Sequence, residues 1–147
     1  GSYSSATNLS GASECTACPA GSACYTGSIE PTPCLPGTFA AKEGQAKCEP
    51  CPPGTSSGQG SVACDECEAG RYAANAGQGL CIPCPHPLSS VKGSTTCSFC
   101  MDNFYQLTSI ADRDVIFKSP TEYCKPCAPN AVCPGNTTLS SLVLPRG

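Results

Sequence analysis

The chain has 147 residues, a formal net charge of −3 at pH 7 and only 13% charged residues. This charge provides no basic field for phosphate backbones or anionic lipids, so it argues against nucleic-acid binding. Tryptophan is absent, aromatic residues make up 6% of the chain, and glycine, proline and cysteine contribute 15 residues each. This composition argues against a large hydrophobic core and is typical of disulfide scaffolds, which persist in oxidising compartments. We therefore expect an extracellular protein, either secreted or at the cell surface.

The sequence predicts no membrane insertion and shows no signal peptide. The longest apolar run near the end covers residues 142–144, far short of the ~18 residues that a membrane span needs. The chain starts without Met, so we expect either that a signal has been removed or that Gly1-Ser2 remains from expression. Two acceptor sequons, Asn8-Leu-Ser and Asn136-Thr-Thr, predict glycans at Asn8 and Asn136.

Residues 1–14 are rich in Ser, Gly and Ala and show no periodicity. We expect them to be a leader that is flexible or becomes ordered only on a partner.

Tandem cysteine-rich repeats occupy residues 15–100. Cys34, Cys67 and Cys100 are each 33 residues apart, and each 33-residue unit holds two loops of 12 or 13 residues between CxxC pairs. The fifth position after the opening cysteine is aromatic in alternate loops, as at Phe39 and Tyr72, so each double unit carries one aromatic ring to lay against its neighbour. A fixed period of this length indicates stacked repeats and not one globular core.

A turn residue follows each opening cysteine by three positions. Glycine takes this position at Gly21, Gly37, Gly54 and Gly70, and asparagine takes it at Asn103 and Asn130. We expect positive φ at all six, because glycine adopts it freely and asparagine tolerates it best among the other residues. Pro87 stands there in the loop after Cys84, and its fixed φ demands another type of turn.

These features predict the fold class. The loops are too short and too rich in Gly and Ser for helices, so we expect irregular hairpins with two or three residues per strand and no wider sheet. The predicted fold is small, disulfide-rich and mostly irregular or β, with tandem disulfide-closed loops in an extended rod and little helix.

Residues 101–133 are interpreted as a terminal repeat with a long apolar hairpin over 101–123. Twenty-three residues separate Cys100 from Cys124, and apolar side chains gather there. Residues 111–114 resemble a turn, and a two-stranded ribbon does not bury so much apolar surface alone. Two interpretations stay open: a small end core against the neighbouring loop, or an intermolecular contact.

Residues 134–147 form an apolar tail that allows the same two interpretations. Together with the terminal repeat, this tail supplies the predicted contact surface. Its residues are Phe104, Tyr105, Ile110, Val115, Ile116, Phe117, Leu142 and Leu144.

The repeat suggests how the 15 cysteines pair, because most closing cysteines are separated from the next opening cysteine by two residues. If each loop is closed at its own base, the disulfides are Cys18–Cys24, Cys34–Cys48, Cys51–Cys64, Cys67–Cys81, Cys84–Cys97, Cys100–Cys124 and Cys127–Cys133. Cys15 is left over, and it is either the end of an array that continues upstream or a thiol that joins another chain. Spacing does not prove this connectivity, since even six cysteines allow 15 arrangements.

Other chemistries of cysteine and histidine fit the sequence poorly. Repeated CxxC pairs are also a zinc pattern, but here their spacing is uniform and His86 is the single histidine. A thioredoxin-like CxxC needs a βαβ context, which the sequence does not supply. His86 stands between two prolines, no GxSxG motif occurs, and Asp112 and Asp114 are interpreted as a solvated turn. We therefore expect no catalytic residues, no cofactor and no metal.

Several motifs resemble one known family. The segments Cys34-Leu-Pro-Gly-Thr-Phe and Cys51-Pro-Pro-Gly-Thr-Ser, with Cys64-Asp-Glu-Cys67, resemble the ephrin-receptor-type cysteine-rich repeat, which is related in style to tumour-necrosis-factor-receptor modules. The ending from Cys127 to Gly147 resembles the segment that closes such arrays in large secreted or surface proteins of protists and algae. The resemblance implies the loop-closing disulfides given above and a longer parent chain or processing at Gly147.

The predicted function is that of a non-enzymatic extracellular structural protein. It would be a spacer or the self-assembling protomer of a surface fibre or matrix filament, with other copies of itself or a longer parent chain as partners. The alternative is a ligand-binding ectodomain module of a receptor that contacts a protein ligand through residues 101–123. The repeat specifies architecture and compartment and no single activity.

Overall fold

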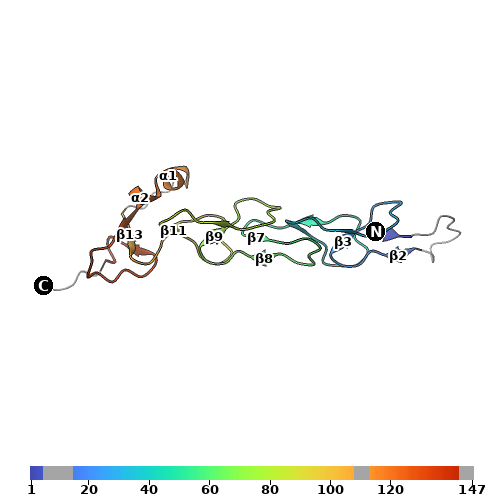
Figure 1. Ribbon diagram of the computed structural model, residues 1–147, viewed down its shortest axis with the longest axis horizontal. Helices are drawn as coiled ribbons and strands as arrows, with labels where there is room; N and C mark the ends of the chain where they lie inside the picture. Colours follow the sequence, from blue (N-terminus) through green and yellow to red (C-terminus); the bar gives the residue numbers. More distant parts are fainter. Residues whose placement is uncertain (5–14, 108–112, 143–147) are drawn as a thin grey trace. The chain divides into compact units, whose positions relative to one another are not determined.

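The computed structural model describes residues 1–4, 15–107 and 113–142. The chain divides into two compact units, each of which is described by itself. The first lies within residues 1–67 and 73–81, and the second within residues 68–72 and 82–147. In Figure 1 the first unit is blue to green, and most of the second is yellow to red.

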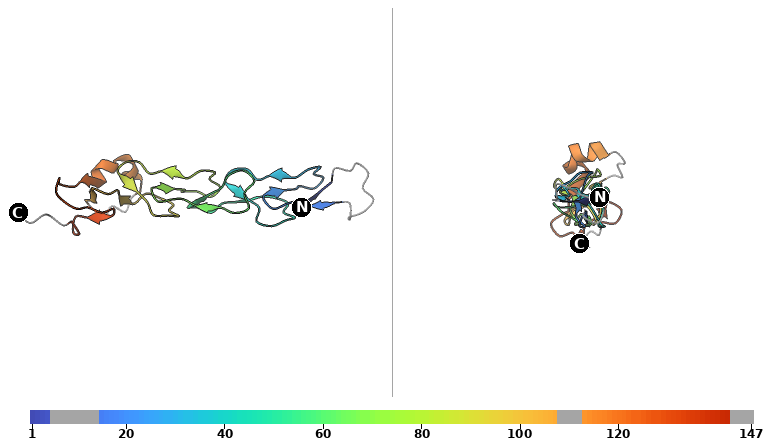
Figure 2. Two further views of the ribbon diagram at one scale, coloured as in Figure 1. Left: turned by 60° about the horizontal axis from the view of Figure 1, so that its bottom comes forward. Right: turned by 90° about the vertical axis from the view of Figure 1, so that its right-hand side faces the viewer.

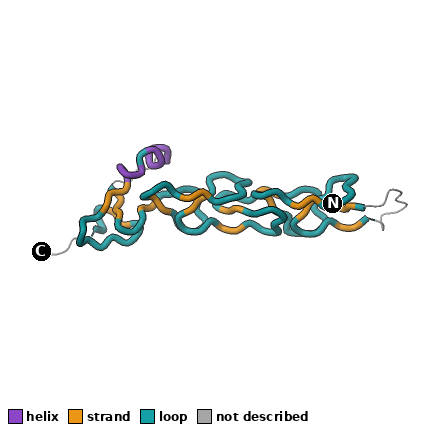
Figure 3. Tube along the Cα trace, in the orientation of Figure 1, coloured by secondary structure: helices purple, strands orange, loops and turns teal. Residues whose placement is uncertain are grey.

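Antiparallel pairs of two-residue strands build the first unit. In chain order, β1 (Ser2–Tyr3) pairs with β2 (Thr16–Ala17), β3 (Ser22–Ala23) with β4 (Thr32–Pro33), β5 (Thr38–Phe39) with β6 (Glu49–Pro50), and β7 (Thr55–Ser56) with β8 (Asp65–Glu66). Figure 3 shows these short strands in orange between longer loops. As predicted, the described residues of this unit form no sheet wider than a hairpin.

The second unit has two hairpins, a three-stranded sheet and two short helices. β9 (Arg71–Tyr72) pairs with β10 (Ile82–Pro83), and β11 (Leu88–Ser89) pairs with β12 (Phe99–Cys100). β13 (Phe104–Gln106) lies between β14 (Cys124–Pro126), which is antiparallel to it, and β15 (Thr137–Thr138), which is parallel. This sheet is wider than the sequence predicted. Figure 2 shows α1 (Arg113–Lys118) and α2 (Pro120–Tyr123) on one side of these strands.

The fold class predicted from the sequence is confirmed in its main features. The described residues form a small disulfide-rich fold of short antiparallel hairpins with two small helices. Seven disulfides close its loops, namely Cys18–Cys24, Cys34–Cys48, Cys51–Cys64, Cys67–Cys81, Cys84–Cys97, Cys100–Cys124 and Cys127–Cys133. Cys15 is unpaired and exposed.

The turn residues hold most of the predicted conformations. The four glycines at the predicted offset have φ between 81° and 87°, and Asn103 has φ of 69°. Pro87 forms a different turn, as expected: its peptide bond to His86 is cis, and the N–H of Leu88 donates to the carbonyl of Pro85 at 2.8 Å. This arrangement is a type VI turn.

The prediction of positive φ at Asn130 is wrong. Among the described non-glycine residues, Asn103 and Asn136 have positive φ, with 68° at Asn136. Asn136 follows Cys133 by three residues. In the last segment the left-handed residue therefore stands three positions after the closing cysteine, Cys133, and not three positions after the opening cysteine, Cys127.

Three kinds of backbone hydrogen bond, of 2.7–3.0 Å, recur between successive loops; the first two occur in both units and the third in the first unit. In the first, the N–H of a turn glycine donates to a carbonyl six residues past the next opening cysteine, in the pairs Gly21–Ala40, Gly37–Ser57, Gly54–Ala73 and Gly70–Ser90. In the second, the next opening cysteine donates its N–H to the carbonyl of that glycine, in the pairs Cys34–Gly21, Cys51–Gly37, Cys67–Gly54 and Cys84–Gly70. In the third, a later glycine donates to the carbonyl of the earlier opening cysteine, in the pairs Gly44–Cys18, Gly60–Cys34 and Gly77–Cys51. Disulfides thus close single loops, and the backbone holds successive loops together.

The doubled repeat has a second structural basis at the sixth position after the opening cysteine. Ala40 and Ala73 are fully buried there, whereas Ser57 and Ser90 are buried in the alternate loops. The Ser57 hydroxyl donates to the carbonyl of Thr38 at 2.9 Å, and the Ser90 hydroxyl donates to that of Arg71 at 2.7 Å. These bonds satisfy hydroxyls that would otherwise be costly to bury.

The hairpin predicted over residues 101–123 is wrong in its second half. β13 pairs with β14 and β15, while Val115, Ile116 and Phe117 lie in α1. Asp114 in the first turn and Lys118 in the last turn of α1 complement its dipole. Pro120 begins α2, a position that its fixed φ favours.

Candidate interaction surfaces

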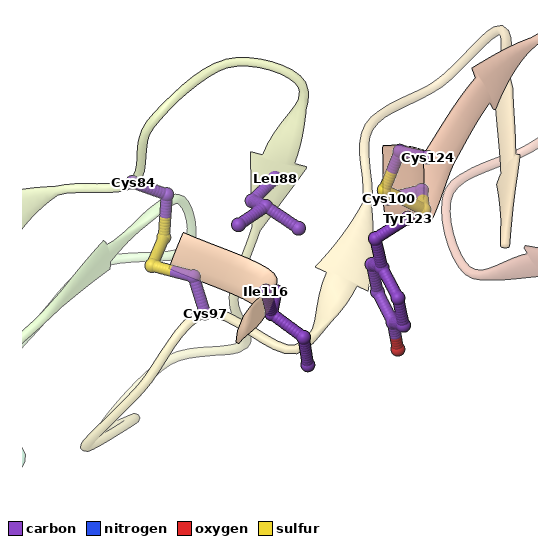
Figure 4. Packing of buried hydrophobic residues seen from close by; sticks show 7 residues of the cluster. All are labelled: Cys84, Leu88, Cys97, Cys100, Ile116, Tyr123 and Cys124. Carbon is purple, nitrogen blue, oxygen red and sulfur yellow. A yellow bond between two sulfur atoms is a disulfide. The ribbon is translucent and has the colours of Figure 1, made fainter. Parts of the chain in front are cut away.

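The apolar residues of the terminal repeat build a small core in the second unit. Leu88 has none of its surface exposed, and Ile116 and Tyr123 keep only 5% and 3%. Figure 4 shows Leu88 and Ile116 between the Cys84–Cys97 disulfide on one side and the Cys100–Cys124 disulfide on the other. This burial supports the end-core interpretation for these side chains.

Two aromatic contacts join neighbouring elements to this core. The Tyr72 and Phe117 rings lie 5.5 Å apart at an interplanar angle of 41°. The His86 and Phe104 rings lie 5.2 Å apart in an edge-to-face arrangement. Tyr72, Phe104 and Phe117 are partly buried against the core, so the aromatic position of the repeat packs against a neighbour here.

Tyr123 is a buried titratable side chain of this core. Its ring is buried, and its hydroxyl donates to the carbonyl of Ser98 at 3.3 Å. Burial raises the pKa of Tyr123 above the ordinary value for tyrosine, because the phenolate loses its hydration.

Only part of the predicted contact surface is therefore available to a partner. Ile116 belongs to the core, and Phe104 and Phe117 pack on it, so the prediction of a contact role for Ile116 is wrong. Val115 is 46% exposed, and Tyr105 and Leu142 are half-buried. The predictions for Ile110 and Leu144 lie outside the described residues.

A groove of about 550 Å³ opens on the second unit. Its lining comes from the end of β11 and the loop after it, from β12 and the residues that follow it, and from the turn before β15. These residues are Ser89, Ser90, Val91, Phe99, Cys100, Met101, Asp102, Gly135 and Asn136. Asp102 Oδ1 accepts the N–H of Gly135 at 2.7 Å, which fixes one wall of the groove.

A second hollow, of about 470 Å³, lies at the N-terminal part of the first unit. Cys15 and Tyr3 line it, together with Tyr25 and Ile29, which are 59% and 70% exposed. Gly1 contributes a carbonyl that accepts the N–H of Cys18 at 3.1 Å, in the way that turn glycines do in later loops. The exposed thiol of Cys15 thus lines the same hollow as the exposed side chains of Tyr25 and Ile29.

Sequence reasoning missed both hollows. For the first unit a signal was present: nine residues separate Cys24 from Cys34, where the other CxxC pairs have two between their cysteines. That longer connection carries Tyr25 and Ile29. The groove of the second unit had no comparable local signal, because its walls come from segments about 45 residues apart.

The structure describes most of the residues that the sequence analysis weighed for catalysis, metal binding or glycosylation. His86 is exposed and Asp114 is exposed in α1, whereas Asp112 falls outside the described residues. Fourteen cysteines form disulfides, so their thiolates are not free to bind zinc. Asn136 is exposed, and Asn8 lies outside the described residues.

The comparison with protein families identifies one module. Residues 54–92 match the family model described as tyrosine-protein kinase ephrin type A/B receptor-like. The search of curated proteins gave no match to the sequence. Within residues 1–4, 15–107 and 113–142, no helix is long and apolar enough to cross a membrane.

The family match and the disulfides point to the same cellular compartment and the same kind of domain. Tandem disulfides persist in oxidising environments, and the matched module is a non-catalytic kind of ectodomain. Together they indicate an extracellular or surface location. The chain contains, over residues 54–92, an ephrin-receptor-like cysteine-rich module within a tandem array of disulfide-closed loops.

Proposed function

We propose that the chain is a non-enzymatic extracellular structural protein, a repeat array that acts as a spacer or as the self-assembling protomer of a cell-surface fibre or matrix filament. The observation that carries this proposal is the recurrence of the same three backbone hydrogen bonds between successive loops. Each loop offers the same donors and acceptors to the next, and each is closed by its own disulfide. Length added in repeats therefore does not depend on a central hydrophobic core.

The partner proposed for assembly is a second copy of the chain. The hollow of the first unit supports this, since an exposed thiol at Cys15 is flanked by exposed Tyr25 and Ile29. An unpaired cysteine in an oxidising compartment forms a disulfide with another chain readily. When such a contact joins two different surfaces without closing a ring, it produces filaments.

Sedimentation velocity over a range of concentrations, with electron microscopy of the same samples, tests the assembly. We expect species larger than the monomer, and their loss in a Cys15→Ser, Tyr25→Ser double variant. Val62→Ser serves as the control, because Val62 is 52% exposed but does not line the hollow. Isolated monomers at every concentration, or unchanged assembly in the double variant, would contradict this part of the proposal.

The alternative is a ligand-binding receptor ectodomain, which the ephrin-receptor-like match over residues 54–92 supports. Val115 on α1 is the most accessible of the predicted contact residues that the structure describes, at 46% exposure. Replacing Val115 with Ser leaves the core side chain of Ile116 in place. If this variant loses a heterologous protein ligand while self-association is unchanged, the receptor function is favoured.

A further inference from the structure

Asn136 stands on the rim of the groove in the second unit and begins the sequon Asn136-Thr137-Thr138. Its backbone position is fixed, because its N–H donates to the carbonyl of Cys100 at 3.1 Å and the next N–H closes a turn onto Pro134 at 3.2 Å. Asn136 itself is exposed. Anything attached to its side chain therefore starts at a defined point beside the groove.

The groove has the chemical character that sugars require. Val91 is 56% exposed, and Phe99 and Met101 are half-buried, so these side chains offer an apolar floor. Asp102 adds a carboxylate to the lining, with Oδ1 accepting the N–H of Gly135. A sugar ring presents C–H groups on one face and hydroxyls at its edges, and sites with mostly apolar walls and a few polar groups bind such amphipathic molecules.

We propose that Asn136 carries an N-linked glycan and that its first sugars occupy this groove. In the transfer, Asn136 Nδ2 forms a bond to the anomeric carbon of a lipid-pyrophosphate-linked oligosaccharide. The bond from that carbon to the pyrophosphate oxygen breaks, the lipid pyrophosphate leaves with the electron pair, and the amide loses one proton. The inference needs passage through the secretory pathway, but it does not depend on whether the chain assembles.

The attached glycan is the favoured occupant because it is tethered to the groove wall. A short link gives it an effective concentration on the order of millimolar at the groove, which a free ligand rarely reaches. Its sugars would also cover apolar surface that is otherwise exposed to water.

Oxidation of Met101 can show whether the groove is occupied. It is the single methionine of the chain and lines the groove. Peroxide oxidises an accessible methionine by transferring one oxygen atom to the sulfur, with release of water, and susceptibility follows exposure. Sugars in the groove would therefore slow the oxidation of Met101.

The experiment uses the full chain from a glycosylating eukaryotic host, with Asn8→Gln in every sample so that Asn136 is the remaining sequon. Three samples are compared: the glycoprotein, the same protein trimmed to its first sugar by an endoglycosidase, and an Asn136→Gly variant. Glycine suits the positive φ at this position, as it does at Gly60 and Gly77, so the variant keeps the turn. Mass spectrometry measures site occupancy and the rate of Met101 oxidation by hydrogen peroxide, with free methionine as an internal reference.

We expect full or partial occupancy at Asn136 and oxidation of Met101 several-fold slower in both sugar-bearing samples than in the Asn136→Gly variant. Absence of a glycan at Asn136 would overturn the proposal. Equal oxidation rates in the three samples would overturn the occupancy of the groove. Slow oxidation in the variant as well would show that the protein alone shields Met101, and this also contradicts the proposal.

Discussion

At the scale of single residues, glycine is used in three different settings in the first unit. Gly37 has φ of 87°, and a Cβ there would run into the backbone carbonyl of Gly77. Gly27 has φ of 83° but open space around it, and Gly58 has open space without positive φ. The three positions separate the cost of the backbone conformation from the cost of the close approach between loops.

Alanine at these three glycines should therefore give graded effects on the free energy of unfolding. Gly58→Ala is expected to be neutral or stabilising by about 0.4–1 kcal/mol, and Gly27→Ala to cost about 1–2 kcal/mol from its left-handed backbone. Gly37→Ala should cost more than Gly27→Ala, because the carbonyl of Gly77 must also move. Urea unfolding with intact disulfides, followed by circular dichroism, measures this. Equal costs for Gly37→Ala and Gly27→Ala would contradict the close contact between loops.

Leu88 tests the small core of the second unit. Leu88→Ala should destabilise that unit by about 2–5 kcal/mol, because it leaves a cavity beside two disulfides. Leu139→Ala is the matched control in the same unit, since Leu139 is 54% exposed, and its effect should stay within about 0.5 kcal/mol. A similar small effect of both substitutions in thermal unfolding would show that disulfides alone stabilise the unit.

Backbone conformations of single residues were predicted correctly where they depend on the residue type alone. Positive φ at Gly37 and Asn103 and the different turn at Pro87 follow from the conformations open to each residue type. The hydrogen bond from Ser57 to the carbonyl of Thr38 was not predicted, because it joins loops 19 residues apart. The alternation of alanine and serine at that position is visible in the sequence, but its meaning needs the stacking of loops.

At the scale of elements, α2 buries Tyr123 in the core, and this makes the stability of the second unit depend on pH. The pKa of Tyr123 is raised by burial, so the folded state keeps its proton at a pH where the unfolded chain has lost it. The stabilisation from Tyr123 is therefore complete below the unfolded pKa of about 10 and is lost as the pH rises through the higher folded pKa.

A pH series of urea unfolding checks this dependence. The unfolding free energy of the second unit should fall as pH rises above about 10, and Tyr123→Phe should flatten this decline. Cys15→Ser is included in all samples so that thiol exchange does not contribute. An unchanged decline in Tyr123→Phe would show that another group is responsible.

The terminal repeat shows where prediction of elements failed. Its run Val115-Ile116-Phe117 consists of β-branched and aromatic residues, which favour strands when considered alone. Packing of Ile116 against Leu88 overrides this preference, and sequence alone does not reveal which distant residue completes a core. The charges at Asp114 and Lys118 were a weak helix signal, but the sequence analysis placed Asp114 in a turn over residues 111–114.

At the scale of the whole molecule, the central claim is a covalent pattern in which every ring closes within one loop and none spans two. The positions of the lysines, arginines and glutamates allow two proteases to test this pattern. Trypsin sites at Lys42, Lys47, Arg71, Lys92, Arg113 and Lys118 all lie inside disulfide loops, and Lys125 precedes a proline that blocks cleavage. Glu66 lies between two loops and is open to a glutamate-specific protease, whereas Glu30 and Glu49, which also lie between loops, precede prolines.

The most direct measurement is the mass of the products of each digestion without reductant, after Cys15 is alkylated and the products are unfolded in acidic urea. Trypsin should leave residues 1–42, 48–113 and 119–146 as one covalent body and release only the cysteine-free peptides 43–47 and 114–118. Cleavage after glutamate should separate residues 15–66 from residues 67–147, because no disulfide crosses Glu66. Separation of the cysteine-containing tryptic fragments, or residues 15–66 and 67–147 that stay joined after glutamate cleavage, would contradict the loop-closing pattern and the repeat array that depends on it.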